Sequence, residues 1–260
     1  MIKSWFIHGI RNGILTTKYP KTLPTTDEIP IKSIPPFGSK DSDWLKGKQI
    51  CPTNAIEDQE KNVDFGKCIF CRRCSDTGFD FEDQNEMRNI ALQAEGLLNI
   101  ENRDKMHEDF KKKIMTFRKS LHILMIDVGS CNACNLEVLN LSNPYYDLTR
   151  LGIFFTNSPK HADVLVVVGA LNYAMVEVLK RTYESMPNPK IVISIGACSI
   201  SGGIFQDTES FVSPIHDVIP VDVTVPGCPP TPIQILEGLL LSMGKNNKQQ
   251  TAEEKHNPPD

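Results

Sequence analysis

After residue 120, apolar runs alternate with amphipathic segments, and this alternation limits the possible folds more than any other feature of the chain. The run at residues 162–171, ADVLVVVGAL, is continuous and rich in valine, which is typical of a strand buried on both faces. Similar short runs occur at residues 121–127, 150–159, 190–198 and 221–228. Helical patterns lie between them, and Asn172 is placed to cap one of these helices. Alternating strands and helices predict an α/β domain with a parallel, doubly wound sheet.

The remainder of the chain divides into regions of different composition. A short helical pattern with basic residues opens the sequence and is followed by a stretch rich in proline and threonine, which we interpret as an extended arm. The last residues are polar and predict a disordered tail. The predicted divisions are 1–48 (amphipathic segment and arm), 49–85 (first cysteine group), 86–119 (charged helical connector), 120–244 (α/β domain) and 245–260 (tail).

Charge and hydropathy exclude several classes of protein. The net charge of −4 provides no basic surface for nucleic acid, so we expect no nucleic-acid partner. No run of eighteen apolar residues exists, and the N-terminus lacks the uninterrupted apolar region of a secretory signal. We therefore expect a cytoplasmic protein.

The eight cysteines need an explanation in a reducing compartment. Three of them, Cys68, Cys71 and Cys74, have C-x-x-C-x-x-C spacing, which is typical of metal or cluster ligands and places disulfides poorly. Thiolates at this density bind iron–sulfur clusters or zinc.

The other cysteines follow predicted strands. Cys131 and Cys134 come after the first strand of the α/β domain, Cys198 after the fourth and Cys228 after the fifth. Open α/β sheets bind ligands at the carboxyl ends of their strands, so these four thiols are expected to converge. Small buried apolar residues are the alternative interpretation. Zinc fits less well than a cluster, because structural zinc sites usually pair two short C-x-x-C motifs and only one is present.

Three motifs of this domain resemble those of a known family. GSCNACNLEV, IGACSISGGIF and VPGCPPTP are similar to the small subunit of membrane-bound, energy-converting [NiFe] hydrogenases and to the related 20 kDa cluster-bearing subunit of respiratory complex I. The resemblance covers about residues 120–243 and implies a flavodoxin-like fold with one [4Fe–4S] cluster beside the active site of a large subunit. The ligands that it implies are Cys131, Cys134, Cys198 and Cys228.

The first of these motifs also separates the two branches of the family. Complex I subunits resemble each other in having adjacent cysteines at this site, whereas the spacing of Cys131 and Cys134 is the hydrogenase-like form. Glu137 matches an acidic position of the motif, which implies a role beside the ligands or in proton handling. An ordinary carboxylate in the first turn of a helix is the alternative for Glu137.

The first cysteine group resembles a bacterial ferredoxin over about residues 49–80, on the motifs CPTNAI and CIFCRRC. This resemblance implies a small ferredoxin-like α+β domain. In two-cluster ferredoxins, the cysteine before proline ligates the cluster of the other motif. By this rule Cys51 joins Cys68, Cys71 and Cys74 around a second [4Fe–4S] cluster. A [3Fe–4S] cluster without Cys51, and a zinc site, are the alternatives.

The segment WFIHGIRNGILTTKYP resembles the start of ferredoxin-type subunits in the same complexes, which implies a surface segment that docks near the membrane arm. Alternatively, it covers the apolar core of this protein.

Together these resemblances imply an electron-transfer subunit of a multi-subunit [NiFe] hydrogenase. Its two [4Fe–4S] clusters would relay electrons between the nickel–iron site of a large subunit and a ferredoxin or another redox subunit. Membrane-arm subunits would hold it at the cytoplasmic face of the membrane. The alternative is the same subunit in a nickel-free, complex I-like oxidoreductase that reduces quinone or sulfur. A non-redox scaffold with structural zinc is a third hypothesis.

Overall fold

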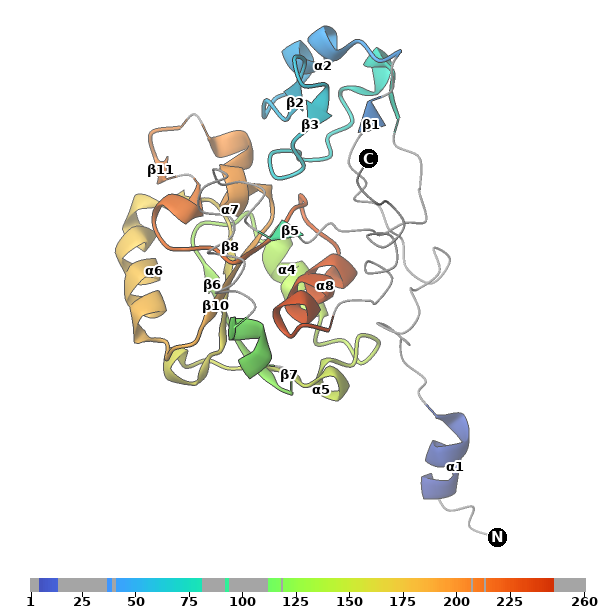
Figure 1. Ribbon diagram of the computed structural model, residues 1–260, viewed down its shortest axis with the longest axis vertical. Coiled ribbons are helices and arrows are strands. Elements are labelled where there is room, and N and C mark those ends of the chain that lie inside the picture. The colour runs from blue at the N-terminus through green and yellow to red at the C-terminus, as the bar shows by residue number, and fades with distance from the viewer. Residues whose placement is uncertain are drawn as a thin grey trace, which may run out of the picture.

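The computed structural model contains a small module with the first cysteine group and a larger α/β domain with the second (Figure 1). It describes residues 5–13, 37–38, 41–80, 92–93, 112–117, 119–206, 208–212 and 214–245.

The α/β domain is built on a sheet with five parallel strands, as predicted. They are β6 (Leu121–Asp127), β7 (Ile153–Phe155), β8 (Val164–Val168), β10 (Ile191–Ile195) and β12 (Val223–Val225). The spatial order is β7-β6-β8-β10-β12, so the first strand lies between the second and the third. This is the flavodoxin-like order, in which the sheet has its topological switch point beside β6.

Helices cover both faces of this sheet. Helices α4 (Ala133–Asn140) and α8 (Pro232–Ser242) pack on one face, and α6 (Tyr173–Ser185) covers the other (Figure 1). Side chains of β8 alternate between the two cores: Val166 packs with the α4 and α8 side, and Leu165 packs with the α6 side. The whole of β8 is buried, which explains its unbroken apolar sequence.

Capping residues define the starts of the two long helices. The Asn172 side chain accepts a hydrogen bond of 3.0 Å from the Met175 N–H, so the predicted cap of α6 is confirmed. At α8, Thr231 and Gln234 form a reciprocal capping box.

Shorter elements complete the domain. They are α5 (Leu148–Leu151), α7 (Ala197–Ser201), the 3₁₀ segments η3 (Pro159–His161), η4 (Gly203–Phe205) and η5 (Ile215–Asp217), and the antiparallel pair β9 (Leu171–Asn172) and β11 (Phe211–Val212).

The small module is α+β, as the ferredoxin resemblance implies. It comprises α2 (Trp44–Ile50), the hairpin of β2 (Ile56–Glu57) and β3 (Asn62–Val63), the 3₁₀ segment η1 (Ser75–Thr77), and β1 (Phe37–Gly38) paired antiparallel with β4 (Phe79–Asp80). Its apolar core contains Trp44, Ile56, Val63 and Phe79, with Cys74 among them.

The expected extended arm is wrong at its C-terminal end. Residues 44–48 are helical in α2, which begins at the cap Asp43 and buries Trp44 edge-on against Phe79, with ring centroids 4.9 Å apart. The module therefore begins before residue 49, because its small core needs the Trp44 ring.

The expected helical connector also differs from the structure. Residues 92–93 form the short strand β5 (Leu92–Gln93), which pairs antiparallel with β12 at the edge of the sheet. Residues 112–116 are helical. The rest of this segment, and the expected tail beyond residue 245, lie outside the described residues. At the N-terminus, α1 (Trp5–Asn12) confirms a short helix whose Trp5 and Ile10 are exposed.

Candidate cluster-binding sites

The sheet topology brings the second cysteine group to the carboxyl ends of its strands. Cys131 lies in the loop after β6, Cys134 is in the first turn of α4, Cys198 is in α7 after β10, and Cys228 follows β12. All four are free thiols. The four side chains predicted from the sequence thus come from three strand ends that are separated by up to 97 residues along the chain, from Cys131 to Cys228.

These four thiols lie close enough together to affect one another's protonation. Burial, together with the charges of Cys198, Cys228 and Cys131, raises the pKa of Cys134 to about 12. Burial also raises the pKa of Cys198 to about 11, again with contributions from Cys228 and Cys131. Four thiolates gathered in this way repel one another unless cations lie between them. The site therefore suits a metal-containing group, which would deprotonate its cysteine ligands on binding.

One carboxylate organises the loop that holds Cys131. Asp127, at the end of β6, accepts hydrogen bonds from the N–H groups of Gly129 and Ser130 at 2.9 and 2.8 Å and from the Ser130 hydroxyl at 2.8 Å. The Asn135 amide, next to Cys134, also donates to it at 2.5 Å. These bonds fix the strand-to-helix turn between the two cysteines and the sheet.

The backbone around this site leaves no room for extra side-chain atoms. Gly196 has φ +91°, and a Cβ at this position would lie 2.6 Å from the Cys134 sulfur. At Gly203, with φ +53°, a Cβ would lie 3.3 Å from the Cys198 sulfur. Glycine is therefore required at Gly196 both by backbone conformation and by the approach of the thiol.

The first cysteine group lines a single pocket in the small module. Cys51, Cys68, Cys71 and Cys74 all contribute to its wall, together with Thr53, Ile56 and Val63. Cys68 and Cys74 are buried, whereas Cys71 is exposed. Burial, with a smaller contribution from the charge of Cys51, outweighs the hydrogen bond from the Phe70 N–H and raises the pKa of Cys68 to about 12. The structure thus places Cys51 beside the C-x-x-C-x-x-C motif, where the ferredoxin crossing rule expects it.

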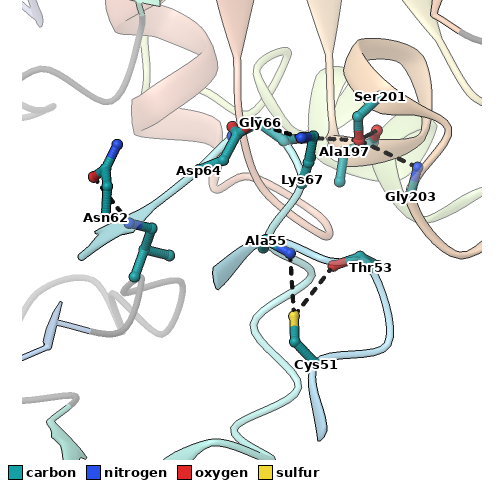
Figure 2. A network of polar contacts seen from close by, with 11 residues as sticks. Cys51, Thr53, Ala55, Asn62, Asp64, Gly66, Lys67, Ala197, Ser201 and Gly203 are labelled. Carbon is teal, nitrogen blue, oxygen red and sulfur yellow. Dashed lines mark hydrogen bonds and ion pairs between the residues drawn. The ribbon is translucent and has the colours of Figure 1, made fainter. Parts of the chain in front are cut away.

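Backbone donors point at the sulfur atoms of this group. The Ala55 N–H donates to the Cys51 sulfur at 3.3 Å, and the Phe70 N–H donates to the Cys68 sulfur at 3.5 Å (the Ala55 bond is drawn in Figure 2). Phe70 and Arg72, between the cysteines, have left-handed φ of 53° and 59°. This strained loop turns the Phe70 N–H toward the Cys68 sulfur, an arrangement that stabilises thiolate charge.

The two cysteine groups lie close enough to influence each other. The charge of Cys71 contributes to the raised pKa of Cys228, after burial and Cys131. Both of these thiols are exposed. In addition, the Ser201 hydroxyl of the α/β domain donates to the Gly66 carbonyl of the small module at 3.1 Å (Figure 2).

Glu137 lies in α4, one turn beyond Cys134. Its charge contributes to the raised pKa of Cys134, so the carboxylate is within electrostatic reach of the site. Its described hydrogen bond is a long one of 3.4 Å from the Asn140 amide. The predicted role of Glu137 beside the ligands therefore remains a prediction.

Among the described residues, no three His, Cys, Asp or Glu side chains meet the geometry of a site for one metal ion.

Several residues of the sites were missed by sequence reasoning. Asp127, Ser130 and Asn135 form the turn at the second group, and Ser201 joins the modules. The D-x-x-S pattern at the end of the first strand signals an Asp side chain that bonds the following backbone. No local pattern signals Ser201, because its partner is 135 residues away.

The chain is thus a flavodoxin-like protein that gathers cysteines from separate strand ends at one edge of its sheet. Residues 131–241 match the family described as NADH ubiquinone oxidoreductase, 20 Kd subunit. The probable membrane-bound hydrogenase subunit mbhJ of Pyrococcus furiosus is 42% identical over 127 residues, which are 49% of this chain and 76% of that protein. An NADH-quinone oxidoreductase subunit of Geotalea daltonii is 43% identical over 119 residues, 46% of this chain and 69% of that protein.

A solved structure of the membrane-bound sulfane sulfur reductase, an archaeal respiratory membrane complex, contains a chain with 30% identity and a TM-score of 0.45. That similarity covers 54% of this chain and 82% of the other.

This chain belongs to the family of the 20 kDa subunit of NADH:ubiquinone oxidoreductase, which includes hydrogenase subunits. It is accordingly an oxidoreductase subunit of the type found in complex I-like and membrane-bound hydrogenase complexes. In the part of the chain that the structure describes, no helix has the length and apolar character needed to cross a membrane.

Proposed function

We propose that the chain is the electron-transfer subunit of a multi-subunit [NiFe] hydrogenase and carries two [4Fe–4S] clusters. Cys131, Cys134, Cys198 and Cys228 hold one cluster, and Cys51, Cys68, Cys71 and Cys74 hold the other. The relay joins the nickel–iron site of a large subunit to a ferredoxin or another redox subunit. Membrane-arm subunits keep the assembly at the cytoplasmic face of the membrane.

The observation that carries this proposal is the gathering of eight free cysteines into two coupled groups of four. Each group contains buried or partly buried thiols with raised pKa values, and Cys71 of one group acts on Cys228 of the other. A single structural site would not need two groups within electrostatic reach. This arrangement suits the transfer of electrons from one site to the next.

The choice of a hydrogenase rests on three further observations. The spacing of Cys131 and Cys134 is the hydrogenase-like form, and the chain shares 42% identity with a probable membrane-bound hydrogenase subunit. An apolar surface also lies next to this site: Leu136 and Leu139 of α4 are about half exposed, at 53% and 52%. Two exposed leucines beside a redox site favour coverage by a large subunit.

The residues of this chain would hold each cluster, limit its contact with water and direct hydrogen bonds at its ligands. A [4Fe–4S] cluster supplies one-electron redox chemistry when it is bound. The N–H groups of Ala55 and Phe70 point at cysteine sulfur and favour the more reduced, more negative state of their site. The burial of Cys68 and the partial burial of Cys134 limit the access of water to each site. Cys71 and Cys228, which act on each other electrostatically, are both exposed, so each site has an accessible thiol for electron exchange.

The test is nickel in the native complex. The complex is isolated under anaerobic conditions through a tag on this chain, and its metals are measured by elemental mass spectrometry. About one nickel per chain, with iron for two clusters, is the expected result. Iron and acid-labile sulfide without nickel would contradict the hydrogenase and leave the relay standing.

The second candidate is the same relay in a complex I-like oxidoreductase without nickel. The 43% identity with an NADH-quinone oxidoreductase subunit favours it. In that case the nickel-free complex should reduce a quinone or a sulfur compound. A scaffold with structural zinc would give a colourless protein that contains zinc and no acid-labile sulfide. That result would contradict both candidates.

A further inference from the structure

We propose that Ser201 is a positioning residue that fixes the small module against the α/β domain and so sets the separation of the two clusters. The inference rests on the proposed two-cluster relay. It assigns to one hydroxyl group the control of a distance that neither module determines alone.

The evidence begins with the position of this hydroxyl group. Ser201 is the last residue of α7, three residues after Cys198. Its hydroxyl donates to the Gly66 carbonyl at 3.1 Å, and Gly66 lies two residues before Cys68 (Figure 2). The bond therefore connects a loop that holds one cysteine group to the helix that holds part of the other.

The groups at both ends of this bond are themselves held in place. On the small module, the Gly66 N–H donates to the Asp64 carboxylate at 2.8 Å, and the Cys68 N–H donates to the Asp64 carbonyl at 3.1 Å. On the α/β domain, the Gly203 N–H donates to the Ser201 oxygen at 3.3 Å, and the Ser201 hydroxyl also faces the Ala197 carbonyl at 3.0 Å. The hydroxyl proton is thus shared between a carbonyl of its own helix and a carbonyl of the other module.

The surroundings give this bond its importance. An open cleft of about 380 Å³ lies beside it, lined by Asp64 and Lys67 from the small module and by Pro214 and His216 from the α/β domain. The two modules are not packed together across this cleft. Continuous apolar packing, which would hold the two modules rigidly, is interrupted at this cleft. The hydrogen bond at the edge of the cleft therefore limits the movement of one module against the other.

A change in the angle between the modules would move Cys71 relative to Cys228, because each is fixed within its own module. Electron exchange between two sites depends on the distance between them. Ser201 therefore does more than end helix α7, because its hydroxyl group bonds the small module.

The experiment compares Ser201→Ala with the wild-type complex, isolated anaerobically through this chain. Hydrogen–deuterium exchange of the segment 64–68, compared at equal iron and sulfide content, measures docking of the small module. Spin–spin interaction between the two reduced clusters, measured by electron paramagnetic resonance, reports their separation. We expect Ser201→Ala to show faster exchange at 64–68 and to lose the resolved spin–spin interaction, with iron and sulfide unchanged.

Two further variants separate this role from a local one. Ser201→Thr retains the hydroxyl group and should restore both wild-type signals. Ser199→Ala removes a hydroxyl from the same helix that bonds only within the α/β domain, to Ser194 and the Ile195 and Gly196 carbonyls. This variant should leave exchange at 64–68 unchanged.

The outcomes distinguish the inference from the proposed function. Unchanged exchange at 64–68 in Ser201→Ala overturns the inference, and so does faster exchange with an intact spin–spin interaction. Equal effects of Ser199→Ala and Ser201→Ala overturn it as well, because they would reveal a local disturbance of α7. A wild-type complex with fewer than two clusters would contradict the proposed function and, with it, the inference about cluster separation.

Discussion

Asp127 illustrates how a single side chain shapes a loop that carries a candidate ligand without being a candidate ligand itself. Burial alone would raise the pKa of this carboxyl, but hydrogen bonds from Gly129, Asn135 and Ser130 outweigh burial and hold the pKa below its ordinary value. The ionised form is therefore the one that shapes the loop. Its stabilising contribution is complete above the unfolded-state pKa of about 3.9 and is lost as the pH falls through the lower folded-state pKa.

We predict that Asp127→Asn weakens the second site. The amide has one acceptor oxygen and no charge, so several of the hydrogen bonds to the loop are lost, at a cost of about 2 kcal/mol or more. The expected result is faster loss of iron and sulfide from this site when a chelator is added anaerobically. Asp217→Asn, at an exposed carboxylate, serves as the control and should release iron at the wild-type rate. Equal rates for all three proteins would contradict the role of Asp127.

Glu237 in α8 is a partly buried carboxyl whose pKa is shifted in the opposite direction. Burial raises its pKa to about 7, and one of its oxygens is buried without a hydrogen-bond partner among the described residues. Because folding raises this pKa, the contribution to stability is present in full below the unfolded-state pKa of about 4.3 and is lost as the pH rises through 7.

Glu237→Gln should therefore stabilise the protein at pH 8 more than at pH 5. The expected difference between the two gains is about 2 kcal/mol, which anaerobic thermal unfolding at both pH values would detect. Glu177→Gln, at an exposed residue of α6 that pairs with Arg181, should show no such difference. The same gain at both pH values would mean that Glu237 is not protonated on folding.

At the scale of elements, α8 follows the loop of Cys228 directly, so its first turn helps to position that loop. Thr231 and Gln234 close a capping box that begins three residues after Cys228. The rest of the helix is almost completely buried against the sheet, so its start is fixed by the cap and its body by apolar packing.

Thr231→Ala should destabilise the α/β domain by about 1 kcal/mol, because the Gln234 N–H loses its side-chain acceptor. Chemical unfolding of the cluster-loaded protein measures this difference. Thr231→Ser retains the oxygen and should stay within a few tenths of a kcal/mol of the wild type. If the Ser and Ala variants are equally destabilised, packing of the threonine methyl group and not capping is responsible.

At the scale of the whole molecule, the two modules combine different sources of order. The α/β domain has two large apolar cores, whereas the core of the small module contains few apolar residues and one of its own cysteines. A module of this size usually needs a bound metal group for stability. We therefore expect the small module to depend on its cluster and the α/β domain to remain folded without it.

Cys51→Ala tests this dependence and the ligand set together. We expect the protein to lose the cluster of the small module, to keep the cluster of the α/β domain, and to lose about half of its iron. Metal analysis and electron paramagnetic resonance measure both effects. An unchanged iron content, or a [3Fe–4S] signal already present in the wild type, would show that Cys51 is not a ligand.

The α/β fold, and the gathering of the four cysteines that follow its strands, can be predicted from the amino-acid sequence alone. Apolar runs such as residues 162–171 report burial on both faces directly, and the alternation of strands and helices leaves few topologies. Parallel strands have their carboxyl ends at one edge of the sheet. The position of each cysteine after a predicted strand is therefore enough to predict that these cysteines meet. Cys51 could be assigned to the first group only through its resemblance to ferredoxins.

The module boundary and the contacts between the modules, in contrast, depend on tertiary packing. Trp44 belongs to the small core because its ring meets Phe79, a residue 35 positions later, and no local pattern records that contact. Ser201 and Gly66 are 135 residues apart, and a serine at the end of a helix has the same sequence signature whether or not it reaches another module. Sequence periodicity reports which face of an element is buried, but only the packed chain shows what that face meets.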